Sequence, residues 1–411
     1  MWRRSDLDVV AGMTPPVYYI GSRQAQKAKH MRCDPTGRRT RRRLSMLLLS
    51  TLLAAGCGPG SATAPARRLR FVPVVGSRTG PSESMLFRVF AGRILPDGGV
   101  VIGDNGTREL RFYAPDGTWL RSVGRRGKGP GEFQFVTAIY ALGDSLFVFD
   151  GALGRMSVFT SAGRYAREFS ILSGGLWWPI GITDDGRLLA ASGTPAPGVA
   201  HAGVVVDSAD YGWYDLDGKP LAFAARLPAG TRVAVTGEDG VRTIQEAPFS
   251  PVPSAVVAGG GFVFSDGEGS IRFLDASGQG TRTSRPAAPP VEIPDAAVDA
   301  YRRERLSRAG ARRARVALVL RNSPFPRYYP VIAELAGGGG VWAQRYRMAR
   351  DTDTEWFVAG GPGSSSGRYA AAGKFRVLDV RGRRALAVRT DDWGVEMAGF
   401  LVPADTAAAG R

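Results

Sequence analysis

The chain contains very little cysteine and histidine. Its 411 residues include two cysteines, Cys33 and Cys57, and two histidines, His30 and His201. The part after Cys57 therefore has no cysteine, which excludes disulfides and thiol chemistry there. It holds a single histidine, His201, so a metal site with several histidine ligands is also excluded, and a Ser-His-Asp triad would have to use this residue. His201 stands in the Pro- and Gly-rich string PAPGVAHAGV, where a lone histidine usually faces solvent.

Near the N-terminus, the apolar run at residues 44–55 is too short to cross a membrane as a helix. It has about a dozen residues, whereas the hydrocarbon core requires roughly 20. Arginines crowd the stretch 38–43 just before it, and small residues lead from it to Gly56 and Cys57. A basic segment, a short apolar segment and small residues before a cleavage point are typical of an export signal.

The string LLAAGC, which ends at Cys57, resembles a bacterial lipobox, although Ala54 occupies the position where leucine is usual. The resemblance implies that residues 1–56 are removed, that Cys57 is lipidated, and that residues 57–68 form a linker. Three alternatives stay open: cleavage near Cys57 without lipidation, export through a twin-arginine signal in the string TRRRL, and a translation start at Met31. Gly58, rather than aspartate, favours anchoring in the outer membrane of a cell envelope.

The formal charge of +17 first suggests a partner such as nucleic acid. Residues 1–56 hold 11 Lys/Arg and three Asp/Glu, so the remaining chain carries +9, and its basic residues are dispersed. An exported protein rarely meets nucleic acid, and we do not expect it to bind any.

Two stretches of sequence repeat with the same spacing. GDNGTRELRFYAPDGTWLRSV begins at Gly103 and FDGALGRMSVFTSAGRYAREF begins at Phe149, and equivalent residues are 46 positions apart. The matching pairs are Asp104 and Asp150, Tyr113 and Phe159, Gly117 and Gly163, and Val123 and Phe169. A third copy follows Asp266, and a weaker one starts at Gly212. A period of about 40 to 50 residues with alternating apolar positions is typical of β-propeller blades.

The connector after the first copy, GRRGKGPGEF, ends at Phe133. Together with the repeat, it resembles the NHL-repeat propellers and a bacterial family of six-bladed propeller lipoproteins. We therefore expect an all-β, six-bladed propeller at residues 69–403, with seven blades as the alternative. The blades fall near 86–123, 133–171, 176–226, 231–283, 325–358 and 368–403, and the strand 69–75 completes the last one. Residues 404–411 are predicted to be disordered.

One segment, residues 294–322, has helical rather than strand periodicity, with apolar Val298, Tyr301 and Leu306. Helical insertions between blades are a feature of the lipoprotein family that the chain resembles. This predicted helix carries many arginines: Arg302, Arg303, Arg305, Arg308, Arg312, Arg313 and Arg315. They either form a solvated face or dock an anionic lipid or polysaccharide.

Asp104, Asp150 and Asp266 recur at one place in the repeat. They either hold their own turns by hydrogen bonds to the backbone or surround a metal ion in the central channel. The sequence favours the turn interpretation, and it indicates no metal site and no cofactor; Ca²⁺ is the alternative.

Aromatic residues occur where each innermost strand is expected to begin, so they would meet at one mouth of the channel. We predict a binding site there that uses Phe133, Trp177, Trp178, Glu246, Phe249, Arg327, Tyr328 and Tyr329. Phe135 belongs to the same set of aromatic residues. Flat apolar side chains suit sugar rings or extended peptides. Packing between blades is the competing interpretation.

These features favour a lipid-anchored envelope protein that binds or scaffolds a glycan, peptide or protein partner without catalysis. The alternative is a metal-dependent propeller hydrolase or lyase, similar to lactonases, that uses channel carboxylates. A third alternative is a structural subunit of an envelope complex.

Overall fold

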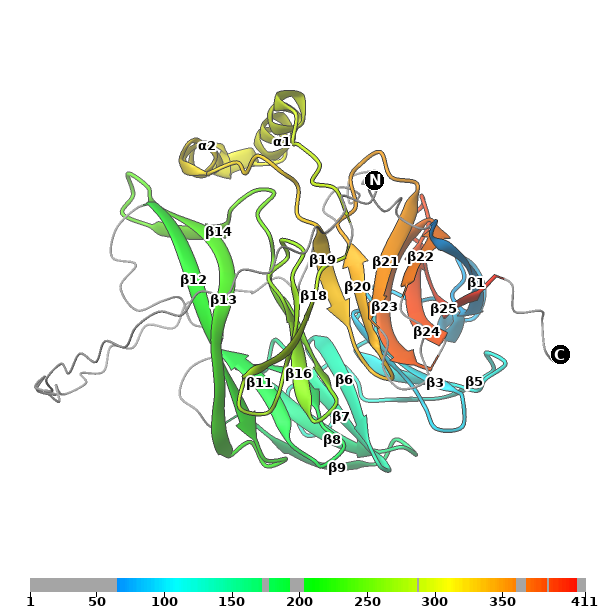
Figure 1. Cartoon of the computed structure of the whole chain (residues 1–411). Helices are drawn as coiled ribbons and strands as arrows, with labels where there is room; N and C mark the ends of the chain where they lie inside the picture. The colour runs from blue at the N-terminus through cyan, green and yellow to red at the C-terminus, as the bar shows by residue number, and fades with distance from the viewer. Residues whose placement is uncertain are drawn as a thin grey trace, which may run out of the picture. The chain divides into compact units, whose positions relative to one another are not determined.

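The computed structural model describes residues 65–171, 177–192, 203–286, 288–359, 367–382 and 384–404. These ranges are built mainly of β-strands (Figure 1). The predicted signal segment, Cys57, His201 and residues 405–411 lie outside them. The export, lipidation and tail predictions therefore stay predictions.

Three sheets have four antiparallel strands each, in sequence order. The first sheet consists of β2 (Ala91–Ile94), β3 (Val100–Asp104), β4 (Glu109–Tyr113) and β5 (Trp119–Val123). The second consists of β6 (Val136–Leu142), β7 (Ser145–Asp150), β8 (Arg155–Thr160) and β9 (Tyr165–Phe169). The fourth consists of β15 (Ser254–Ala258), β16 (Gly261–Ser265), β17 (Ile271–Leu274) and β18 (Gly280–Ser284).

The third sheet has a different outer part. Its strands are β10 (Trp177–Ile182), β11 (Leu188–Ser192), β12 (Gly203–Tyr214), β13 (Pro220–Thr236) and β14 (Arg242–Glu246). β13 runs unbroken for 17 residues and carries β14 on its far end. The boundary predicted between residues 226 and 231 is therefore wrong, because β13 passes straight through it.

The remaining strands form one eight-stranded sheet of two halves. The first half consists of β19 (Ile332–Ala336), β20 (Val341–Arg345), β21 (Asp353–Ala359) and β22 (Gly367–Ala372). The second half consists of β23 (Lys374–Arg381), β24 (Arg384–Thr390), β25 (Glu396–Pro403) and β1 (Arg67–Val75). β1 pairs antiparallel with β25 along most of its length, and its Arg67 and Arg68 pair with β22. The sequence predicted this pairing of the two ends of the described chain.

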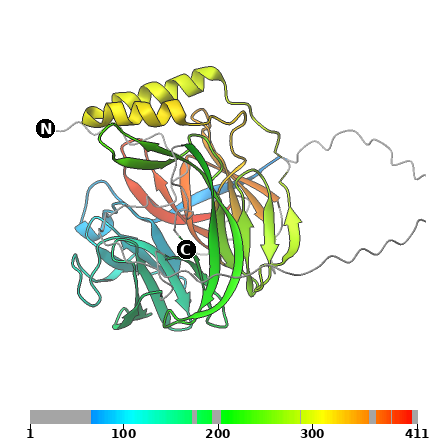
Figure 2. The ribbon, with the colours of Figure 1, turned by 90° about the vertical axis from the view of Figure 1, so that its left-hand side faces the viewer.

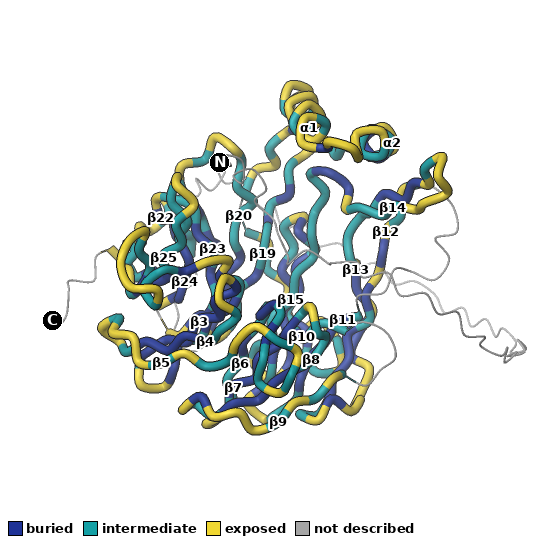
Figure 3. Tube along the Cα trace, turned by 180° about the vertical axis from the view of Figure 1, so that it is seen from behind, coloured by how far each residue is buried: buried dark blue, intermediate teal, exposed yellow. Residues whose placement is uncertain are grey.

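The first strands of successive sheets touch in a closed ring. Contacts lead from β2 to β6, β10, β15, β19 and β23, and from β23 back to β2. Buried residues gather between the sheets, as the dark segments of Figure 3 show. One core cluster joins Phe112 of the first sheet to Phe159 of the second, and another joins Ile102 of the first sheet to Phe400 of the last half-sheet. The arrangement is that of a propeller, in which each sheet hides its faces against its neighbours.

Turn chemistry explains why the repeated motif recurs. The Asp104 carboxylate accepts a hydrogen bond from the Gly106 amide at 2.7 Å, and Asp150 accepts one from the Ala152 amide at 2.9 Å. Gly117 has φ +89°, and a side chain there would lie 2.3 Å from the carbonyl oxygen of Val74. Only glycine satisfies both requirements of this turn.

The segment predicted as one helix contains two, α1 (Asp295–Ser307) and α2 (Arg313–Asn322), with a short 3₁₀ turn (η2, Gly310–Arg312) between them. Gly310 has φ +50°, which an α-helix cannot contain, and the chain changes direction there. A second 3₁₀ turn, η1 (Ser82–Ser84), precedes β2. Figure 2 shows the two helices lying along one end of the β structure. Within the described ranges, no helix is both long enough and apolar enough to span a bilayer.

Candidate functional site: a cleft beside the helices and a polar network on the inner strands

An aromatic cluster joins the helical insertion to the β structure. Phe249, at a backbone φ of +55°, lies 5.2 Å from the Tyr301 ring of α1 and 5.6 Å from Tyr329. Phe325 completes the cluster, with centroid distances of 6.2 Å to Phe249 and 6.4 Å to Tyr301. Tyr329 in turn stacks on Tyr346 at 5.6 Å and 25°. Aromatic pairs at these distances add stabilisation beyond their buried area, so the cluster fixes α1 on its support.

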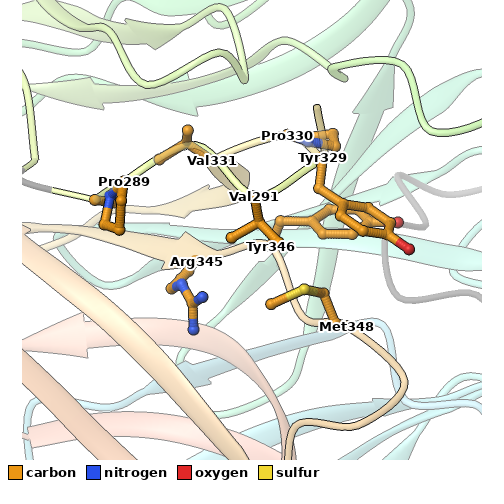
Figure 4. Close-up of a pocket in the computed structure, with 9 residues that line it drawn as sticks. Pro289, Val291, Tyr329, Pro330, Val331, Arg345, Tyr346 and Met348 are labelled. Carbon is orange, nitrogen blue, oxygen red and sulfur yellow. The ribbon is translucent and has the colours of Figure 1, made fainter. Parts of the chain in front are cut away.

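A cleft of about 490 Å³ opens next to this cluster. It is lined by Val291, Glu292, Ile293, Pro294, Asp295, Tyr329, Met348, Ala349 and Arg350. A smaller hollow adjoins it and shares Val291, Tyr329 and Met348; Figure 4 shows these residues with the stacked Tyr329 and Tyr346 rings. Apolar and aromatic side chains therefore form much of the lining of the cleft, beside Glu292, Asp295 and Arg350.

Backbone hydrogen bonds hold the walls of the cleft in place. The Ile293 amide donates to the Arg327 carbonyl, and the Tyr329 amide donates to the Val291 carbonyl, both at 2.9 Å. The Tyr346 amide donates to the Val331 carbonyl at 2.9 Å. Three separate chain segments are thus joined at the cleft, which gives its side chains a fixed spacing.

Charged residues of both signs also line the cleft. Glu292 forms a 3.0 Å ion pair with Arg327, which raises the pKa of that arginine. Asp295 begins α1, and Arg350 is an exposed residue of the cleft lining. Burial, with smaller contributions from the nearby Tyr329 and Tyr301, raises the pKa of Tyr346 to about 12, so this tyrosine stays a neutral hydrogen-bond donor at physiological pH.

The structure brings together only part of the predicted mouth site. Phe249 and Tyr329 are in contact, Tyr329 lines the cleft, and Arg327 is paired at its rim. Tyr328 is 41% exposed, with the Arg327 guanidinium 5.2 Å from its ring centre. Glu246 is exposed at the end of β14.

The other predicted aromatics pack between sheets. Phe133 is fully buried and lies 5.8 Å from Phe159. Trp177 packs edge-on against Tyr214 at 5.4 Å, and Trp178 against Phe149 at 5.5 Å. Phe135, 8% exposed, packs against Phe90 at 5.2 Å. Their contacts match the competing interpretation, in which the aromatics are packing residues.

Sequence reasoning missed a polar network on the innermost strands. Asp379 of β23 forms a 2.7 Å ion pair with Arg93 of β2 and accepts a hydrogen bond from the Ile94 amide at 2.9 Å. Burial raises the pKa of Asp379, and Arg93 opposes that rise. Tyr140 of β6 donates to the Pro179 carbonyl of β10 at 2.8 Å. Polar side chains therefore link β23 to β2 and, separately, β6 to β10.

Glu334 of β19 belongs to the same inner set, and its pKa lies near neutrality. Desolvation raises the pKa of its carboxyl to about 7, and the Arg376 guanidinium opposes the rise only partly. Arg376 itself lies 3.9 Å from Glu396 and donates to the Val89 carbonyl. A carboxyl group that titrates near neutrality can hold or release a proton under physiological conditions. Its signal in the sequence was a single acidic residue inside the short apolar strand IAELA.

The recurring aspartates do not converge. Asp104 and Asp150 end strands of the first and second sheets, Asp266 follows β16 of the fourth, and each accepts hydrogen bonds from the amides of its own turn. In the described part of the chain, no three or more His, Cys, Asp or Glu side chains come together in a group that could hold a metal ion. The turn interpretation of these aspartates agrees with their contacts.

No family model and no curated protein matches the chain. Solved structures with similar traces include a protein of Bacteroides fragilis described as exported, at 10% identity and TM-score 0.47, covering 81% of this chain and 94% of that one. Virginiamycin B lyase from Staphylococcus aureus aligns at 11% identity and TM-score 0.41, covering 81% and 99%. BamB from Moraxella catarrhalis aligns at 12% identity and TM-score 0.34, covering 78% and 85%. Membership of the NHL-repeat-like lipoprotein family stays a prediction.

Proposed function

We propose that this chain is an exported, lipid-anchored, six-bladed β-propeller that binds a partner at the cell envelope without catalysis. The closed ring of six innermost strands supports the blade count, because each of these strands begins a group of four or five strands. The signal-like segment before Cys57 supports export and anchoring.

The observation that carries the binding role is the cleft beside α1. Tyr329, Met348 and Val291 provide apolar and aromatic surface, and Arg350 and Asp295 can orient the polar groups of a ligand. Sites for small ligands and peptide segments commonly combine an apolar lining with a few placed polar groups. Methionine adapts its shape to different apolar partners, which suits a peptide or glycan ligand.

A thermal-shift screen of the full chain against glycans and peptides tests this role. A ligand present at about 100 times its dissociation constant stabilises the protein by about 2.7 kcal/mol, which is readily detected. Met348→Ala and Arg350→Ala should abolish the shift. Trp393→Ala, which removes a 78% exposed aromatic away from the cleft, should leave it unchanged.

The same screen includes Ca²⁺ with a chelator control. A Ca²⁺ shift that the chelator reverses would favour the alternative, a metal-dependent hydrolase or lyase. A glycan or peptide shift that survives both cleft substitutions would refute the assignment of the cleft.

A further inference from the structure

The helical insertion presents a concentration of positive charge. Residues 295–322 contain eight arginines and three acidic residues, a formal charge of +5. Most of α1 and both ends of α2 are exposed (Figure 3), and both helices lie at one end of the β structure (Figure 2).

The apolar side of the insertion is already used. Leu318 and Val319 of α2 pack on Val233, Val235 and Ala247 of the third sheet. On α1, Tyr301 inserts into the aromatic cluster with Phe249 and Phe325. These contacts fix which sides of the helices meet the protein, and all arginines of the insertion except Arg315 are exposed.

Only some of the arginines are neutralised within the protein. Arg308 pairs with Glu304 at 2.8 Å, Arg302 lies 3.5 Å from Asp299, and Arg315 pairs with Asp239 of the β13–β14 turn.

Four others are exposed, and within the described ranges their side chains make no ion pair or hydrogen bond: Arg303, Arg305, Arg312 and Arg321. These four define what we call the arginine ridge. Arg313, also exposed, donates to the Leu306 carbonyl and keeps its charge.

We propose that the arginine ridge docks on the anionic headgroups of the membrane that holds the lipid anchor. The charge of the ridge is complementary to such a surface, and guanidinium groups pair well with phosphate oxygens. This inference rests on the proposed function in one respect, the anchor at Cys57. Arg67, where β1 begins, follows Cys57 by ten residues, a tether of at most about 35 Å.

The tether makes weak contacts effective, because it keeps the ridge at a high local concentration near the bilayer. A basic surface adds electrostatic attraction to anionic lipids to the attachment that the lipidated cysteine provides. The docked helices would also set which end of the protein faces the membrane.

Vesicle sedimentation tests the proposal with the full chain carrying Cys57→Ser, so that no lipid is attached. Vesicles of phosphatidylcholine alone are compared with vesicles that also contain phosphatidylglycerol, at low and high salt. We expect binding to the anionic vesicles only, and its loss at high salt.

A triple variant, Arg303→Gln, Arg305→Gln and Arg312→Gln, should lose affinity by about fivefold per arginine, on the order of a hundredfold in total. The matched control removes three exposed charges elsewhere, Arg70→Gln, Arg164→Gln and Lys219→Gln, and should bind almost as the parent does. Equal melting temperatures would show that both variants are folded.

Three results would overturn the proposal: no preference of the parent for anionic vesicles, an equal loss in both variants, or binding to an anionic polysaccharide but not to vesicles. The outcome is independent of the cleft, since a ligand-induced thermal shift that depends on Met348 tests the proposed function separately.

Discussion

Glu334→Gln should remove a large pH dependence from the stability of the fold. The carboxyl group has a pKa of about 7 in the folded chain, against 4.5 in its ordinary state. The folded protein therefore binds this proton more tightly than the unfolded chain does. The stabilisation is fully present below pH 4.5 and is lost as the pH rises through 7. Since one pKa unit corresponds to about 1.36 kcal/mol, the loss amounts to about 3 kcal/mol.

Glutamine resembles the protonated acid in shape and cannot ionise. The variant and the parent should therefore have similar unfolding free energies at low pH, and the variant should be more stable by up to about 3 kcal/mol at high pH. Urea unfolding of both proteins at a series of pH values measures the difference. Asp379 and Glu396, whose pKa values burial also raises, are present in both proteins, so their titration cancels to first order.

Glu246→Gln, at an exposed position on β14, provides the control. The difference in unfolding free energy between the Glu334→Gln variant and the parent should change with pH. If this difference is the same at acid and alkaline pH, the assignment of a desolvated carboxyl on β19 is wrong.

The remaining predictions concern packing, a turn and the anchor. Trp178→Ala should destabilise the protein by about 2 kcal/mol, because the indole packs on Phe149. Chemical unfolding measures this loss, and an unchanged midpoint would favour ligand binding over packing as the role of Trp178. Gly117→Ala should lower the free energy of unfolding by about 2 kcal/mol or more, because the residue has a positive φ and the added methyl group would clash with Val74. Gly154→Ala should cost less in the same assay, because Gly154 also has a positive φ but no atom lies near the added methyl group. Cys57→Ser should release the protein from membranes washed at high salt, which also removes binding through the arginine ridge, without changing its melting temperature; a salt-washed membrane fraction that still holds the variant would refute the lipid anchor.

The repeated part of the fold was predictable because its signals are local. Each Asp turn and each positive-φ glycine lies within a few residues of the strands that it joins, so the motif appears in the sequence as a spacing. The pairing of β1 with β25 followed from the need to cover an exposed sheet edge.

The failures arise from contacts between distant segments. β13 continues past the predicted boundary, and near its far end Val233 and Val235 lie under α2, which comes much later in the chain. The pKa of Glu334 depends on the groups that surround its carboxyl in the folded protein, and the residues next to it in the sequence do not reveal those groups. Aromatics at strand beginnings look alike in the sequence whether they line a cleft, as Tyr329 does, or fill the core, as Phe133 does.

The pairing of β1 with β25 imposes an order on assembly. Among the described strands, β1 leaves the ribosome and any export channel first, and β25 leaves last. Because Leu69 of β1 pairs with Pro403 of β25, β1 cannot complete its pairing until β25 is available. Until then β1 has no antiparallel neighbour, and its unpaired edge is open to wrong partners. Truncation anywhere in the last half-sheet would therefore leave both ends of the chain unsecured. Complete synthesis of the polypeptide thus becomes a condition for completing the last half-sheet.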